Sequence, residues 1–174
     1  AKLSGSRSYV LTGDGALLEQ AVLQFTQDML VERGFTLMSV PVLVNENVMQ
    51  GTGYFPLGRE QAYCVEKDKM ALVGTSEVPL CSYHADEVLD ESELPKRYMA
   101  RTTCFRREAG TYGKDTKGLY RVHQFSKVEM VVLASNDKEK TDKLHEELVK
   151  NSEDLLKALE LPYRKVYVCT GDLG

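Results

Sequence analysis

Two extended stretches joined by a polar loop constrain the fold of this 174-residue chain more than any other feature. Residues 97–107 and 119–133 are each predicted as a strand, and the segment between them, 110–118, is polar and rich in glycine. Two such strands joined through one loop form an antiparallel hairpin. Since side chains two positions apart on a strand share a face, the sequence shows which residues this hairpin presents together.

One face of the predicted hairpin carries polar and aromatic side chains. On the first strand Arg106 and Glu108 share a face, and on the second the shared set is Arg121, His123, Phe125, Lys127 and Glu129. The residues alone leave two interpretations open. The face is the solvated side of an antiparallel sheet, or it is a nucleotide site in which a ring receives a purine and arginine forks bind phosphate oxygens. His123 by itself is interpreted as a structural hydrogen-bonding residue.

Positive charge gathers around the same hairpin, although the chain has a net charge of −4. The basic residues are Arg106, Arg107, Lys114, Lys117, Arg121 and Lys127, against the two acidic residues Glu108 and Asp115. Such a cluster is either a phosphate-binding region or part of a solvated hairpin. Because neither a P-loop nor a GxGxxG sequence is present, a nucleotide would have to be held in some other way.

The rest of the chain alternates short strands with helices. Helices are predicted from a cap at Asp14 to Gly34, over 45–50, over 75–85 with a Thr cap, and over 136–161; further strands are predicted at 6–11, 35–44, 62–65, 70–73 and 163–169. Pro41 places its strand at an edge, an irregularity or a subunit boundary. The sequence therefore predicts one α+β domain, a mainly antiparallel sheet flanked by helices.

Composition excludes several classes of protein. Apolar residues make up 43% and charged residues 28%, which is ordinary for a folded domain. Neither a membrane-spanning run nor a signal peptide is present, so a cytoplasmic or organellar-matrix location is expected. Four isolated cysteines, without a CxxC pair, and three histidines without ligand spacing predict neither a disulfide framework nor a metal site.

Several motifs in order resemble the class II aminoacyl-tRNA synthetases. The sequence FRREAG at 105–110, followed by RVHQF at 121–125 and by Glu129, resembles the family's second signature motif, in a form similar to its seryl branch. The long helix followed by Gly-Phe at 34–35 and Val-Pro at 40–41 resembles the first, dimer-forming motif. The segments 51–53, 75–80 and 170–174 also fit the seryl branch. The resemblance implies a partial catalytic core, with motif 1 at about 14–44 and motif 2 at about 97–133, that lacks the N-terminal tRNA-binding arm and the third motif.

The resemblance also implies roles for the residues of an ATP site. Arg106, the catalytic residue, would bind the α-phosphate, with Arg107 in the same ATP-binding set. Phe125 would stack on adenine, Glu108 would lie near its amino group, and the main chain at Val122 would contact the nucleotide.

An L-serine site is implied beside it. Thr75, Ser76 and Glu77 would receive the α-amino end of serine, and Glu129 would help to bind the hydroxyl. Arg106 belongs to the same serine-binding set. The implied activity is activation of L-serine with ATP and Mg²⁺ to seryl-adenylate, followed by transfer to tRNA(Ser), in a homodimer formed through motif 1.

Two other functions remain as hypotheses. An amino-acid:carrier-protein ligase would charge a protein instead of a tRNA, but such relatives typically use zinc, and Thr75 with Glu77 fits a zinc-free pocket. A non-catalytic paralogue would act only as a dimerising module, against which the intact set of Arg106, Glu108, Phe125 and Glu129 argues.

Overall fold

The computed structural model describes residues 2–110 and 118–172, and it divides the chain into two compact units, 1–135 and 136–174. The order of the elements is α1 (Asp14–Glu32), β1 (Thr36–Leu37), β2 (Leu43–Asn45), α2 (Glu46–Gly51), η1 (Arg59–Gln61), β3 (Tyr63–Val65), η2 (Glu66–Asp68), β4 (Met70–Leu72), α3 (Glu77–Ser82), η3 (Glu91–Glu93), β5 (Lys96–Phe105), β6 (Gln124–Leu133), α4 (Lys138–Ala158) and η5 (Thr170–Asp172). The first unit contains every element up to β6, and the second contains α4 and η5.

The predicted hairpin is confirmed. β5 and β6 pair antiparallel over their whole length, from Lys96 opposite Leu133 to Phe105 opposite Gln124. β6 begins at Gln124 rather than at the predicted residue 119, and the hydrogen bonds of His123 explain why. The His123 N–H donates to Arg7 O instead of continuing the ladder, and its ring Nδ1 takes the place opposite Arg106 O at 3.0 Å.

Two small sheets make up the first unit, one ordered β1-β5-β6 and the other β2-β4-β3. Only β1 pairs parallel, with β5, and the other pairings are antiparallel, which confirms the predicted α+β class. The strand predicted at 35–44 is divided into β1 and β2, which join different sheets. Pro41 lies between them, since proline has no N–H to donate to a ladder, so the irregularity predicted there is confirmed.

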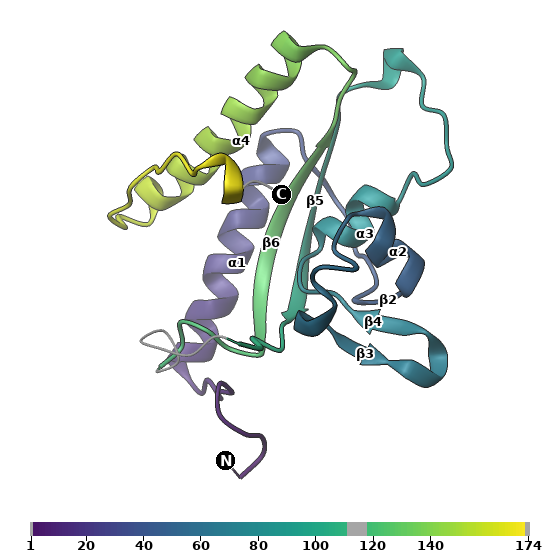
Figure 1. The fold of residues 1–174 in the computed structure, drawn as a ribbon. Helices are drawn as coiled ribbons and strands as arrows, with labels where there is room; N and C mark the ends of the chain where they lie inside the picture. The colour runs from purple at the N-terminus through teal and green to yellow at the C-terminus, as the bar shows by residue number, and fades with distance from the viewer. Residues whose placement is uncertain (1, 111–117, 173–174) are drawn as a thin grey trace. The chain divides into compact units, whose positions relative to one another are not determined.

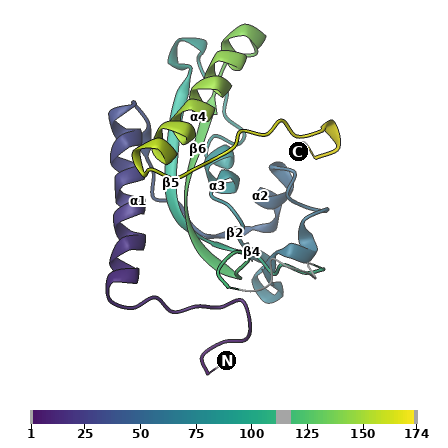
Figure 2. The same cartoon turned by 90° about the vertical axis from the view of Figure 1, so that its left-hand side faces the viewer.

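Helices cover both faces of the β5–β6 hairpin, with α1 on one side and α3 on the other (Figures 1 and 2). Under α3 the side chains of Leu80, Ala100 and Val131 form a buried apolar cluster. A second cluster joins the small sheet to α2 and α3, and its members are Val44, Met49, Phe55, Ala62, Ala71, Val73 and Val78. These two clusters place the ends of β4 and α3 beside the hairpin.

The predicted helices form, with corrections at their starts. The N-cap of α1 is Gly13 at φ 55°, and no side chain caps the helix, so the prediction of an Asp14 cap was wrong. Asp14 lies in the first turn instead, where its charge still complements the helix dipole. Gly34 at φ 83° ends the helix as predicted. α3 is shorter than predicted, and its N-cap is Ser76, although the Thr75 hydroxyl accepts from the Glu77 N–H at 3.2 Å.

Two predicted strands, at 6–11 and 163–169, were wrong. Neither segment pairs with any strand of the described residues, and 163–169 is exposed throughout. Within 2–110 and 118–172, no helix is long and apolar enough to cross a membrane. The predicted basic residues Lys114 and Lys117, with Asp115, and the last two residues of the 170–174 motif lie outside the described residues.

Candidate functional site

A cavity of about 530 Å³ opens where the hairpin ladder ends. It is lined by Arg106, Glu108, Leu119, Tyr120, Arg121, Val122 and Phe125. Four of the five residues predicted to hold ATP are among them, and Arg107 is not. A guanidinium, a carboxylate and an aromatic ring therefore line one space.

Among the described residues, the Arg106 guanidinium is held at one nitrogen. Its Nε donates to Gly74 O at 3.2 Å, and its Cζ lies 5.3 Å from the centre of the Phe125 ring, a cation–π distance. No described residue bonds the two terminal amino groups. Those groups form a planar fork that fits two oxygens of an oxyanion, and Arg106 lines the cavity.

Glu108 is a buried carboxylate on a strained main chain. Only 9% of the residue is exposed, and its φ is 51°, in the left-handed region that few residues other than glycine adopt. Its Oε2 lies 3.1 Å from Arg121 Nη1, and its carbonyl accepts from Arg7 Nη1 at 2.8 Å. Two arginines from distant segments thus hold Glu108 at the cavity wall.

Close packing brings the main chain of Gly74 to Arg106. A Cβ atom on Gly74 would lie 2.5 Å from the Tyr54 hydroxyl and 3.5 Å from Arg106 Cγ, so a side chain at Gly74 would displace its neighbours. Burial raises the pKa of Tyr54, and the phenol is therefore protonated at neutral pH. Sequence reasoning missed both residues, because nothing in the local patterns indicated that 54 and 74 meet.

A second polar cluster lies on the same hairpin face, nearer to α3. The Thr75 hydroxyl donates to Glu129 Oε2 at 2.7 Å and accepts from Lys127 Nζ at 2.8 Å, and Lys127 also pairs with Glu129. Burial raises the pKa of the Cys81 thiol, and the charges of Glu77 and Glu129 raise it further. Thr75 and Glu129, both predicted to bind serine, are thus in direct contact, but Glu129 does not line the cavity.

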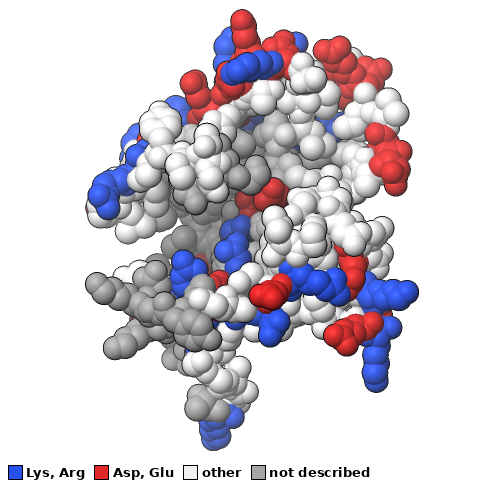
Figure 3. Space-filling model, viewed as in Figure 1, with Lys and Arg blue, Asp and Glu red and all other residues white. Residues whose placement is uncertain are grey.

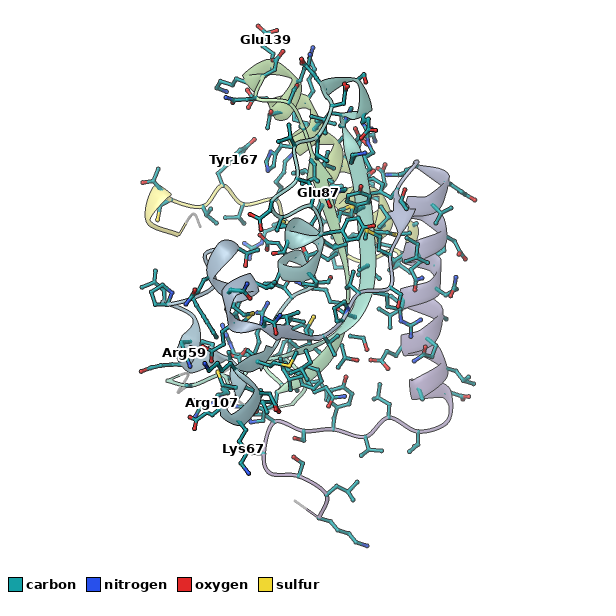
Figure 4. All side chains as sticks on the ribbon, turned by 90° about the vertical axis from the view of Figure 1, so that its right-hand side faces the viewer. Arg59, Lys67, Glu87, Arg107, Glu139 and Tyr167 are labelled. Carbon is teal, nitrogen blue, oxygen red and sulfur yellow. The ribbon has the colours of Figure 1, made fainter. Side chains whose placement is uncertain are left out.

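The remaining predicted residues differ in their surroundings. Ser76 is fully buried, and its hydroxyl has no hydrogen-bond partner among the described residues, whereas Glu77 is exposed. Arg107, labelled in Figure 4, is also exposed, and its Nη1 donates to Glu60 O at 3.3 Å. It is not among the residues that line the cavity. His123 bonds to Arg106 O and packs edge-on against Tyr63, which confirms its structural role.

The described residues include charged side chains and side chains of the kinds that bind metals. Acidic and basic side chains lie side by side over β3 and β4 (Figure 3), as the run Glu66, Lys67, Asp68 and Lys69 implies. Among the residues that the structure describes, no three His, Cys, Asp or Glu side chains gather to hold a metal. Within residues 2–110 and 118–172, Glu108 is the single acidic residue in the lining of the cavity.

Comparison with known proteins decides the family. A sequence model described as the tRNA synthetase class II core domain (G, H, P, S and T) matches residues 63–174. The chain belongs to the class II tRNA synthetase core family. This confirms the resemblance to the class II synthetases, and it agrees with the α+β fold, whose structural neighbours are class II synthetase cores.

Relatives of this class II core are serine–tRNA ligases. The proteins of Nocardia farcinica and Deinococcus radiodurans are 53% and 50% identical over the whole chain, which spans 41% of the length of each. The crystal structure of seryl-tRNA synthetase from Pyrococcus horikoshii complexed with ATP is 44% identical, with a TM-score of 0.93 over 99% of this chain and 38% of that one. The cytoplasmic serine–tRNA ligase from Naegleria fowleri, in complex with AMP, is 35% identical, with a TM-score of 0.88 over 94% of this chain and 38% of that one.

Proposed function

We propose that this chain binds ATP and L-serine and forms seryl-adenylate as part of a serine–tRNA ligase. The observation that carries the proposal is the shared cavity of Arg106, Glu108 and Phe125. The ATP and AMP complexes of the two similar synthetases support a nucleotide as the ligand. Adenine would stack on Phe125, with its amino group towards Glu108, and the main chain at Val122 would contact the nucleotide.

The reaction is an in-line displacement at phosphorus. A carboxylate oxygen of serine forms a bond to the α-phosphorus of ATP, the bond from that phosphorus to the bridging oxygen breaks, and pyrophosphate leaves. Arg106 would bind the α-phosphate oxygens and offset their charge, as a pre-oriented donor does in a desolvated site. Mg²⁺, which is usually held by phosphates and one or two carboxylates, would neutralise further charge when bound. The phosphates themselves would hold it, because Glu108, the one carboxylate in the described lining of the cavity, would face the adenine amino group.

Serine would bind at the cluster of Thr75, Lys127 and Glu129. The Thr75 hydroxyl already makes three hydrogen bonds, so it serves mainly to orient Glu129. Glu129 Oε1 makes no bond to a described residue, and it would accept from the serine hydroxyl. Glu77, at the start of α3, would attract the ammonium group, and main-chain groups at Ser76 would line the same end of the pocket. A site built to bond a hydroxyl rejects the deoxy analogue strongly.

The complete activity involves more than these residues. We propose that 1–174 belong to one catalytic domain, with motif 1 at 14–44 and motif 2 at 97–133, that the seryl group passes to tRNA(Ser), and that the protein acts in the cytoplasm. The exposed apolar residues Leu17, Leu18 and Phe25 on α1 support a homodimer formed through motif 1. A monomer in sedimentation equilibrium would contradict the dimer.

ATP–pyrophosphate exchange tests the proposed function. It should be measured with a panel of amino acids on the complete natural protein, because the chain spans 41% of the length of its relatives. We expect exchange with serine, and we expect Arg106→Ala to lower it by at least about 100-fold, the effect of losing one oriented donor, without a change in the midpoint of unfolding.

The matched control is Arg164→Ala, because Arg164 is exposed and lies outside the cavity lining; its loss should change exchange far less. Exchange with another amino acid but not with serine would refute the assignment. Normal exchange in Arg106→Ala would remove Arg106 from the mechanism. A complete protein that binds no ATP in calorimetry would favour the non-catalytic paralogue.

A further inference from the structure

The main chain just beyond β5 is held along one edge by residues far away in the sequence. The N–H groups of Phe105, Arg107 and Ala109 donate in turn to Val73 O at 2.9 Å, Gln61 O at 2.8 Å and Gln61 Oε1 at 3.1 Å. Because alternate N–H groups of an extended chain point the same way, the bonds of Phe105 and Arg107 continue the strand edge without a neighbouring strand. The Ala109 bond follows the left-handed residue Glu108. Two of the three acceptors belong to Gln61.

The opposite edge is held by other segments. The Arg106 N–H donates to His123 O, and the Glu108 carbonyl accepts from Arg7. Both residues whose side chains enter the cavity from this segment, Arg106 and Glu108, therefore lie between two fixed edges. The apolar clusters of the core include neither of them, so these polar contacts decide where their side chains point.

The Gln61 carboxamide uses both of its functional ends on one residue. Its Nε2 donates to Ala109 O at 2.9 Å, and its Oε1 accepts from the Ala109 N–H. Ala109 directly follows Glu108, the residue with φ 51°. A left-handed conformation at a residue other than glycine costs about 1–2 kcal/mol, so it persists only when its neighbours are fixed. The carboxamide supplies that fixation on the C-terminal side of Glu108.

We propose that Gln61 is a positioning residue for the nucleotide cavity. Its carboxamide holds Ala109, which keeps Glu108 in the left-handed conformation with its carboxylate at the cavity wall before a nucleotide arrives. The inference rests on the proposed function for the identity of the ligand, ATP. It assigns no contact between Gln61 and ATP. It leaves the Thr75–Glu129 cluster unaffected, because the Gln61 carboxamide bonds to Ala109 and not to Thr75 or Glu129.

A nearly isosteric variant, Gln61→Glu, tests the proposal through pH. An ionised carboxylate has no donor, so it repels Ala109 O; a protonated carboxyl restores one donor and one acceptor. In the complete protein we expect the Kd for ATP to rise about tenfold over wild type at about pH 8, the equivalent of about 1.4 kcal/mol. The ratio of the two Kd values should fall towards one as the pH approaches about 5, near the range in which glutamate titrates.

Two further variants make the test specific. Gln61→Met has no donor at any pH, so its Kd ratio should stay high across the range. Gln50→Glu adds the same charge at an exposed position on α2, and its ratio should stay near one. None of the three variants touches Thr75 or Glu129. The KM for serine should therefore change by less than about twofold, far below the tenfold change that about 1.4 kcal/mol would produce.

A measurement without ATP separates this inference from the proposed function. The Ala109 amide should exchange its hydrogen slowly in the wild-type protein and quickly in Gln61→Met. Equal protection in both, or a Kd ratio for Gln61→Glu that does not respond to pH, would overturn the proposal. If the wild-type protein binds no ATP, the proposed function and the nucleotide assignment both fail, while the amide exchange still shows whether Gln61 holds Ala109.

Discussion

The two ends of the β5–β6 hairpin are built by different kinds of interaction. At one end, which we call the α3 end, Leu80, Ala100 and Val131 exclude water by apolar packing. At the other, the cavity end, Arg106 and Glu108 are placed by hydrogen bonds from distant residues such as Gln61 and Arg7. The α3 end therefore contributes stability, and the cavity end holds the site residues in position. Variants at the two ends should therefore change different measured quantities.

The largest effect is expected from Leu80→Ala at the α3 end. Leu80 is fully buried, and truncation of a buried leucine typically costs 2–5 kcal/mol, so we expect the free energy of unfolding to fall by about 3 kcal/mol. The Kd for ATP of the folded fraction should stay within about twofold. Chemical denaturation followed by calorimetry measures both quantities.

The control for Leu80→Ala is Leu57→Ala, the same truncation at a residue that is 94% exposed. It should change the free energy of unfolding by less than about 0.5 kcal/mol. If Leu80→Ala weakened ATP binding as much as it lowered stability, the proposed division between the two ends would be wrong.

An intermediate effect is expected from Gly74→Ala at the cavity end. The new methyl group would lie 2.5 Å from the Tyr54 hydroxyl, and overpacking of this kind costs about 1–3 kcal/mol. Because Gly74 O accepts from Arg106 Nε, we expect ATP to bind about tenfold more weakly. The measurement is the Kd for ATP by calorimetry.

Removal of the clashing atom sharpens that test. In Tyr54→Phe the hydroxyl is absent, and the nearest ring atom to the new methyl group would be 3.2 Å away. The double variant Gly74→Ala with Tyr54→Phe should therefore recover most of the lost affinity, whereas Tyr54→Phe alone should change little. Additive losses in the double variant would show that the clash is not the cause.

The smallest effect is expected from Ser76→Ala, between the two ends. The Ser76 hydroxyl is buried without a partner among the described residues, and an unsatisfied buried hydroxyl is destabilising. Its removal should raise the free energy of unfolding by up to about 1 kcal/mol and leave the KM for serine unchanged. A large rise in that KM would instead show that the hydroxyl binds the amino acid.

The sequence predicted well those parts of the fold that depend on local pattern. Apolar spacing indicated α1, and Gly34 marked its end because only a left-handed residue fits there. Alternation indicated the hairpin, and short strands were predicted where β3 and β4 form. The same reasoning failed at 6–11 and 163–169, since alternation shows that a segment can be extended but not that a partner strand lies beside it.

The candidate site was predictable only in part, for a related reason. Arg106, Glu108 and Phe125 were found because they share one hairpin face and one family motif. Gln61 and Tyr54 were not found, because their roles depend on contacts that cross from the small sheet to the hairpin. The start of β6 was placed five residues too early for the same reason, as the main chain of His123 bonds to a segment more than a hundred residues away.

The contact between Arg7 and Glu108 joins residues 101 positions apart, and the one between Thr75 and Glu129 joins residues 54 apart. Contacts of such long sequence separation close large loops and form slowly during folding. The ligand pocket should therefore be among the last parts of the first unit to mature, after the local hairpin of β3 and β4. Acquisition of ATP affinity during refolding would then report the completion of the native state rather than its early collapse.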